Sequence, residues 1–291
     1  HVIGETPETL ALAFQFLINL NSTGVWAQAS GGVLTVYARA TGAQGNAIAL
    51  SAGTTATNLT ATASGPALSG GMDPVWLTDL SALPRINRAA RDWFAAYFAA
   101  LHGYGIDAVA SFSTELGNGD SSPAAGIAQR YYDGTPVVVN TPALQTNFSP
   151  RSLDFWKEAY LEVAGLQAGA GLTPYLQFGE IQWWYFPETD ASGSAISMPF
   201  YDAFTTSAFQ TQYGHALGLI ANNTVDPGTI PSEAAFLSTL IGQHTAQIRE
   251  YVLATYPDCR FEVLYPNDVN APALNRAVNY ATADWTPANL A

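Results

Sequence analysis

The stretch 173–186, TPYLQFGEIQWWYF, constrains the fold more than any other part of this chain. An apolar run opened by Pro174 is interrupted by one carboxylate, Glu180, and then continues into two tryptophans. A buried parallel strand is nearly all apolar, and a charge within it costs free energy unless the charge is paired or has a chemical role. Because β/α barrels carry catalytic carboxylates at the ends of their strands, the stretch predicts a buried strand with Glu180 as an active-site residue. The alternative is a structural glutamate that caps a helix or pairs with an arginine.

Three further stretches have the same form, an apolar strand pattern that ends in a polar side chain. They are 106–116 with Glu115, 135–142 with Asn140, and 260–268 with Asp268. Helical patterns separate these stretches, at 124–132, at 150–168 after a Ser149 cap, and at 208–221 and 232–255. Such alternation favours parallel β/α units joined by right-handed crossovers. The sequence therefore predicts an α/β fold in which residues 72–291 form a (β/α) barrel-like domain, a partial TIM barrel.

An open, doubly wound sheet is the alternative fold. No glycine-rich phosphate loop follows any of the strand patterns, so nucleotide binding has no support in the sequence. The remaining barrel strands either lie in stretches that resemble loop or helix, or belong to a longer protein of which this chain is a piece. We expect the second.

Residues 1–71 have a different pattern and predict a small α+β module. Thr6 is placed to cap a helix that has Pro7 at its first position. Alternating apolar residues then predict a hairpin of strands 25–29 and 33–39, joined through glycines, and two further strands at 47–50 and 59–63.

Within this module, three segments resemble a small module of contractile-phage tail sheath and other tail-associated proteins. They are GGVLTV at 31–36, ATGAQGNAIAL at 40–50 and LSGGMD at 68–73. The resemblance implies a structural or surface-exposed, phage-derived context, and contact with other chains of a larger protein or particle.

The acidic composition excludes several classes of partner. Ten Lys and Arg residues stand against 23 Asp and Glu residues, a formal net charge of −13, and Lys157 is the only lysine. Nucleic-acid affinity comes mainly from basic side chains on phosphates, so neither nucleic acid nor an anionic membrane surface is an expected partner. No apolar run reaches the roughly 18 residues that predict a membrane span. A neutral glycan is compatible with this charge.

Cysteine, histidine and serine do not predict a reactive or metal site. Cys259 is the only cysteine, which excludes an intrachain disulfide and predicts a packing residue. His102, His215 and His244 lie on helix-like stretches without ligand spacing. Ser113 lacks the Gly-x-Ser-x-Gly pattern of a nucleophile elbow. No metal and no cofactor are expected.

The strand ends predict carboxylate chemistry. Because strand ends converge on one face of a barrel, Glu115 and Glu180 are expected to face each other. Glycosidases use such pairs, separated by about 5–5.5 Å in retaining enzymes and about 6.5–9.5 Å in inverting ones. One carboxyl must stay protonated as the acid, which an apolar setting favours, and the other must be ionised as nucleophile or base.

Polar and aromatic residues near these carboxylates are the expected substrate contacts: Asn140, Gln182, Trp183, Trp184 and Tyr265. Adjacent strand residues point to opposite faces, so one of the two tryptophans is expected in the core and the other against a sugar. Asn140 either binds a substrate hydroxyl or satisfies a loop, and Tyr265 belongs either to the core or to the site.

The segments FSTEL at 112–116 and QFGEIQWW at 177–184 look like strand-end motifs of barrel glycoside hydrolases related to the cellulase and β-galactosidase clan. The resemblance implies one acid/base glutamate and one nucleophile glutamate. It also implies an oligo- or polysaccharide as the substrate.

This sequence departs from that family at two points. The usual Asn-Glu pair is Thr114-Glu115 here, and the family's nucleophile lies three strands after the acid/base, which from Glu115 leads to Glu262 or Asp268. We expect Glu115 as the acid/base and Glu180 as the second carboxylate, with Asp268 as the substitute.

Two functions from different classes follow. The first is a glycoside hydrolase-like protein that cleaves or binds a glycan with paired strand-end carboxylates. The alternative is a non-catalytic structural or glycan-binding component of a phage tail or particle. An extracellular or virion-associated location suits both.

Overall fold

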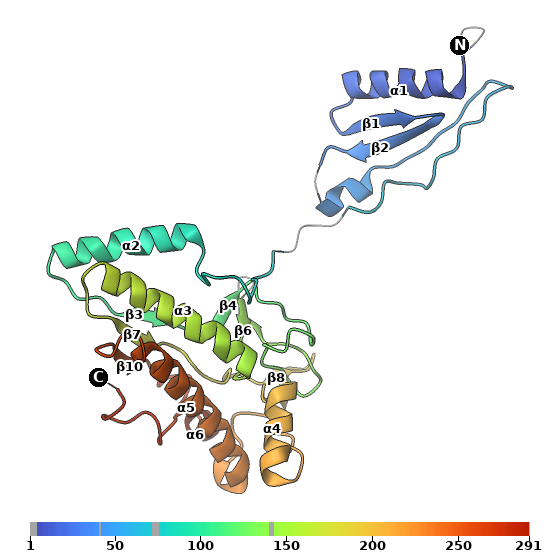
Figure 1. Cartoon of the computed structure of the whole chain (residues 1–291). Coiled ribbons are helices and arrows are strands. Elements are labelled where there is room, and N and C mark those ends of the chain that lie inside the picture. Colours follow the sequence, from blue (N-terminus) through green and yellow to red (C-terminus); the bar gives the residue numbers. More distant parts are fainter. Residues whose placement is uncertain (1–4, 41, 72–75, 140–142, 291) are drawn as a thin grey trace. The chain divides into compact units, whose positions relative to one another are not determined.

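The computed structural model of the chain describes residues 5–40, 42–71, 76–139 and 143–290 (Figure 1). The chain divides into two compact units, His1–Trp76 and Leu77–Ala291. Among the described residues, none of the helices combines the length and apolarity needed to cross a membrane.

The first unit begins with α1 (Pro7–Asn21), which has the expected cap. The Thr6 side chain accepts a hydrogen bond from the backbone amide of Thr9, and the Thr9 side chain accepts one from the amide of Thr6, which completes a capping box. The expected hairpin is confirmed as β1 (Val25–Ser30) and β2 (Val33–Ala38), which pair antiparallel.

The two further strands expected in this unit are wrong. Residues 42–47 form a 3-10 helix, η1 (Gly42–Ala47), and residues 47–50 contribute only an isolated bridge between Ala49 and Ala67. Residues 59–63 have no regular structure. Side-chain bonds replace the ladder here, because Asn46 Nδ2 donates to the carbonyl of Gly71 (2.7 Å) and Asn46 Oδ1 accepts from the amide of Gly71 (2.9 Å).

The second unit is built on a parallel sheet of β3 (Ala110–Phe112), β7 (Tyr175–Phe178) and β10 (Arg260–Val263), in the order β10-β7-β3. Strands that follow one another in the chain are neighbours, and the order advances in one direction. A barrel and one half of a doubly wound sheet both have this order. The parallel strands and the helices that alternate with them confirm the α/β prediction. The described residues form no closed barrel, and the partial barrel stays a prediction.

Short antiparallel strands lie beside this sheet. They are β4 (Glu115–Gly117), β6 (Ala143–Gln145) and β5 (Val138–Val139), in the order β4-β6-β5, and the pair β8 (Glu188–Thr189) and β9 (Ala195–Ser197). Of the expected strand 135–142, the described part forms β5 and joins an antiparallel sheet, not the parallel one. The expected strand 106–116 is divided, because β3 ends at Phe112 and Glu115 begins β4 in the other sheet.

The helices of the second unit are α2 (Arg88–Gly103), α3 (Pro150–Gly169), α4 (Ala203–Tyr213), α5 (Pro231–Leu253), α6 (Ala273–Asn279) and the 3-10 helix η2 (Pro227–Thr229). Ser149 caps α3 as expected by accepting from the amide of Ser152. α4 begins before the predicted range 208–221 because Asp202 caps it. The helix expected at 124–132 is wrong, since Ala128 and Arg130 make β-bridges.

One face of the parallel sheet carries the core. The ring of Phe178 lies 5.3 Å from the rings of both Tyr160 and Phe261, and the ring of Tyr160 lies 4.3 Å from that of Phe112. Each aromatic pair contributes about 0.5–1.5 kcal/mol beyond the burial of its area. Tyr160 belongs to α3, which packs against α5 (Figure 1). Every second residue of each strand thus packs against the helices. The residues between them lie on the other face of the sheet.

Candidate functional site

The chain leaves β7 at a point that requires glycine. A Cβ on Gly179 would clash with the hydroxyl of Ser111 and lie 3.0 Å from the carbonyl oxygen of Phe112. The next residue, Glu180, has φ of +23°, a conformation that residues with a side chain rarely adopt. The backbone therefore turns out of the sheet at the carboxylate that the sequence singled out.

Buried amide side chains hold the segment after this turn. The fully buried Gln129 donates from Nε2 to the carbonyls of Thr146 (3.0 Å) and Gln182 (2.9 Å). Its Oε1 accepts from the amide of Trp184 (2.8 Å). Gln145 Nε2 is a second donor to the carbonyl of Gln182, at 3.2 Å. The segment lies outside the strand ladders, and these side chains replace a strand neighbour.

Two further residues complete this support. Thr114 Oγ1 donates to the carbonyl of Glu180 at 3.2 Å. Asn279 of α6 bonds both backbone groups of Trp183, because its Oδ1 accepts from the amide (2.8 Å) and its Nδ2 donates to the carbonyl (3.2 Å). Gln129, Gln145 and Asn279 were not predicted as functional residues from the sequence. The only sequence signal for them is an amide side chain among apolar residues. Such a side chain needs hydrogen-bond partners when it is buried.

The charges of the three predicted carboxylates affect the pKa of a shared neighbour, Tyr185. Burial raises the pKa of Glu115, and the neighbouring charge of Glu180 raises it further. Burial also raises the pKa of Tyr185, and three carboxylate charges add to this rise, in decreasing order those of Glu180, Glu115 and Asp268. Glu115 therefore keeps its proton to a higher pH than an ordinary glutamate, and Tyr185 keeps its own more strongly than a free phenol.

The expected substrate contacts are placed differently from one another. Trp183 has no exposed surface, and its Nε1 donates to the carbonyl of Leu237 at 3.0 Å. A ring enclosed in the core offers no face to a ligand, which corrects the expectation for Trp183. Gln182 is also buried, so its side chain does not reach an open surface either. Asn140 lies outside the described residues.

Trp184 is the half-buried tryptophan of the two. Its ring stacks on Tyr185, with centroids 4.5 Å apart and planes at 27°. Phe186, which is exposed, meets the edges of both rings at 5.7 Å and 4.7 Å. Tyr185 connects these three aromatic residues to the predicted carboxylates, whose charges raise its pKa.

Tyr265 lies elsewhere. It lines an open cavity of about 820 Å³ between α5, the segment after β10, and α6. Its ring meets Tyr280 edge to face at 5.3 Å, and its hydroxyl is buried with no hydrogen-bond partner. Glu115, Glu180 and Asp268 are not among the residues that line this cavity. Tyr265 therefore lines a cavity to which none of the three carboxylates contributes.

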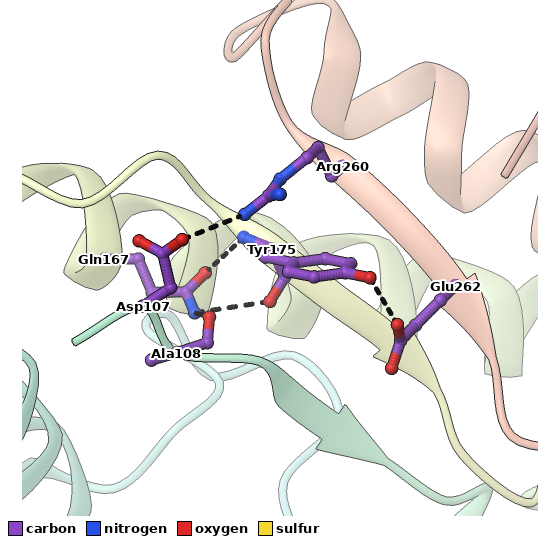
Figure 2. Close-up of polar contacts among 6 residues, drawn as sticks. All are labelled: Asp107, Ala108, Gln167, Tyr175, Arg260 and Glu262. Carbon is purple, nitrogen blue, oxygen red and sulfur yellow. Dashed lines mark hydrogen bonds and ion pairs between the residues drawn. The ribbon is translucent and has the colours of Figure 1, made fainter. Parts of the chain in front are cut away.

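The other face of the parallel sheet carries a polar network that the sequence analysis did not predict (Figure 2). Glu262 of β10 accepts hydrogen bonds from the Tyr175 hydroxyl and the Gln177 amide of β7. The Arg260 guanidinium lies 4.2 Å from the centroid of the Tyr175 ring and 3.8 Å from the carboxylate of Asp107. Glu262 is thus satisfied within the sheet, which supports a structural role for it.

A buried glutamine connects this sheet to α3 (Figure 2). Gln167 Nε2 donates to the carbonyls of Ala108 (3.0 Å) and Tyr175 (3.3 Å), and its Oε1 accepts from the amide of Tyr175 (3.0 Å). One side chain therefore fixes the start of β7 beside the segment that leads into β3.

The described residues contain no group of three or more His, Cys, Asp or Glu side chains placed to hold a metal ion. His244 is buried in α5, and burial lowers its pKa to about 3. Burial raises the pKa of the Cys259 thiol to about 12. Neutral, enclosed side chains of this kind pack rather than react.

A glutamate of raised pKa, Glu115, and three aromatic side chains are the chemical features of the candidate site. Such a carboxyl suits a general acid, and the aromatic rings suit contacts with a polar ligand that has apolar faces. The hydrogen bonds of Gln129 hold the backbone of the same site, as a structural role requires.

The chain matches the protein family described as "Non-contractile tail sheath protein TIM barrel" over residues 75–286. This range takes in most of the second unit, including all three strands of the parallel sheet. No curated protein matches the chain.

Proposed function

This chain belongs to the family of non-contractile tail sheath protein TIM barrels, and from this membership we propose that it is a structural subunit of a phage tail. The match over residues 75–286 is the observation that carries the proposal. It supports the alternative function expected from the sequence. The family match covers residues 75–286 and names non-contractile tails. The resemblance seen in the sequence concerned residues 1–71 and contractile tails, so the support comes from a different part of the chain.

In this role the second unit contributes a rigid body to an assembly of many chains. Side-chain amides satisfy the backbone of residues 182–184, and a polar network covers one face of the parallel sheet. Parallel sheets are ordinarily covered on both faces. Paired polar groups on the second face allow it to meet water or the polar surface of a neighbouring chain.

A second candidate function is contact with a glycan at the strand ends. One observation favours it: Trp184, Tyr185 and Phe186 form an aromatic series beside Glu115 and Glu180. No comparison supports glycoside hydrolysis, so cleavage by this pair stays a prediction. Glycan binding is compatible with a place on a particle surface.

Sedimentation velocity and negative-stain electron microscopy of the purified chain test the structural proposal. We expect assemblies larger than a pair, in the form of rings or tubes, at high protein concentration. Incubation with reducing-end-labelled oligosaccharides tests the second function. Two results together would overturn the structural proposal. The chain would show turnover that is abolished by Glu115→Gln and by Glu180→Gln, and it would form no assembly. Assembly that both variants retain, without turnover, supports it.

A further inference from the structure

The helix α1 of the first unit carries apolar side chains toward solvent. Five of them are exposed by half or more: Leu12 55%, Phe14 52%, Phe16 65%, Leu17 51% and Leu20 68%. We call these five residues the α1 apolar surface. Soluble helices usually expose their polar face, and a helix that is apolar all round is normally buried.

The opposite side of α1 is already occupied by its own hairpin. Ala11 is buried there, and two amide side chains bond the outer edge of β1. Asn19 bonds both backbone groups of Ala27, at 2.7 Å and 2.9 Å, and Gln15 Oε1 accepts from the amide of Ala29 at 2.5 Å. The α1 apolar surface is therefore not needed to hold this unit together.

The size of the surface fits a protein interface. A large apolar side chain offers about 150–200 Å², so five that are half to two-thirds exposed present about 500 Å². This is near the upper end for the largest apolar patch of a monomer, about 300–600 Å². A standard interface takes about 800 Å² from each partner, and in homodimers about 65% of it is apolar. The α1 apolar surface supplies that apolar share.

The charge and spacing of α1 favour a second copy of the chain as the partner. Glu8 is the only charged residue of α1, so two chains of net charge −13 can approach there without close like-charge contacts. Leu12, Phe16 and Leu20 are four residues apart and form one ridge. Ridges of this spacing pack into each other's grooves when two helices cross at about −50°. A two-fold axis makes such a surface complementary to itself.

From these observations we propose that α1 is a self-association surface, on which the α1 apolar surface of one chain packs against that of a second copy. An anionic membrane is a poorer occupant, because helices that lie on membranes carry Lys and Arg on their polar face and α1 has none. The inference rests on the proposed function in one respect, because a structural subunit of a phage tail assembles with other chains. It names the surface through which two of them would pair.

Two variants of the full chain test the pairing by sedimentation velocity. Phe16→Glu places a charge at the centre of the ridge, and we expect it to raise the dimer dissociation constant at least about tenfold. The matched control is Leu219→Glu, at a loop residue of the second unit that is 56% exposed. The control should leave dissociation unchanged. Circular dichroism establishes that both variants keep their helix content.

Cross-linking provides a second measurement that does not depend on weakening the dimer. Helix axes 8–10 Å apart bring facing Cα atoms within the 4.4–6.8 Å of a disulfide. We expect Phe16→Cys to give a disulfide-linked dimer under mild oxidation, and Leu219→Cys to stay monomeric. The native Cys259 is buried and its pKa is raised to about 12, so it does not compete.

The outcomes separate this inference from the proposed function. A wild-type chain that stays monomeric at about 100 μM, where a micromolar pair is almost fully formed, overturns it. Rings or tubes that survive Phe16→Glu overturn the α1 pairing and leave the structural role intact. A dimer that Phe16→Glu abolishes and Phe16→Cys traps, with no larger assembly under any condition, supports the pairing and contradicts the tail-sheath role.

Discussion

The Gln129 side chain offers the sharpest test of how the strand-end segment is held. It makes three buried hydrogen bonds, to the carbonyls of Thr146 and Gln182 and from the amide of Trp184. Methionine has nearly the same shape and none of these donors or acceptors. The variant Gln129→Met therefore removes the bonds with little change of packing.

The expected cost follows from the groups left without a partner. A buried unsatisfied polar group costs about 1–3 kcal/mol. The carbonyl of Gln182 keeps the Gln145 donor at 3.2 Å, so the largest losses fall on Thr146 and Trp184. We expect Gln129→Met to lower the free energy of unfolding by about 3–5 kcal/mol. For a unit of 150–250 residues this is a fall in Tm of roughly 10 °C.

Urea unfolding followed by tryptophan fluorescence measures this loss. Trp156, Trp183 and Trp285 are all buried in the second unit, so the signal reports its unfolding. The control is Gln243→Met on the exposed side of α5, which should change stability by less than about 0.5 kcal/mol. A loss in Gln129→Met within about 1 kcal/mol of the control would refute the view that these amides replace a strand neighbour.

Three further outcomes are expected. Burial lowers the pKa of His244 from 6.5 to about 3, so between these pH values the unfolded chain binds a proton that the native chain does not. The free energy of unfolding therefore decreases as the pH is lowered through this range. His244→Leu removes this group, and we expect the decrease to be smaller in the variant. Urea titrations at several pH values measure this, and an unchanged slope would contradict it. Glu180→Gln should lower the pKa of Glu115 modestly, because burial is the larger cause of its rise and the Glu180 charge the smaller; carbon-13 NMR of labelled glutamate reads the titration, and a rise would contradict it. Gly179→Ala should destabilise the second unit by about 1–3 kcal/mol through overpacking, whereas Gly117→Ala, which meets no atom within 4 Å, serves as the control.

Local signals in the sequence were enough to predict several helices and one hairpin. Thr6 and Ser149 precede helices that begin where the caps indicate, because capping involves only residues close in the chain. The hairpin of β1 and β2 pairs residues across a short turn. The parallel order of β3, β7 and β10 followed from the alternation of strand and helix patterns.

Distant contacts determined what the sequence could not reveal. Residues 106–116 have the pattern of one strand, yet the carbonyl of Thr114 accepts from both the amide and the hydroxyl of Thr146, each at 2.9 Å. These bonds pull the chain into the antiparallel sheet and end β3 at Phe112. Strand boundaries of this kind depend on a partner 32 residues away.

The candidate site stays a prediction. Glu115 begins β4 and Asp268 lies beyond the end of β10 at Val263, yet the charges of Glu115, Glu180 and Asp268 all raise the pKa of Tyr185. The adjacent tryptophans were expected on opposite sides, and Trp183 lies in the core while Trp184 is half-buried. The place of Tyr265 in the cavity beside α5 and α6 depends on the path of the chain after β10, which no local pattern specifies.

The four glutamates and aspartates at the strands show why a carboxylate pattern alone does not distinguish catalysis from structure. Glu262 lies within β10, where a charge is costly. The hydroxyl of Tyr175 (Figure 2) and the amide of Gln177, both on the neighbouring strand, satisfy it. Those partners lie 87 and 85 residues away, so the sequence showed only an acidic residue in a strand. At Glu180 the partners of the backbone come from other elements, and the carboxylate stays close enough to Glu115 to raise its pKa. A structural subunit and an enzyme with the same strand order would therefore show similar acidic positions in sequence, and only the surroundings of each carboxylate separate the two.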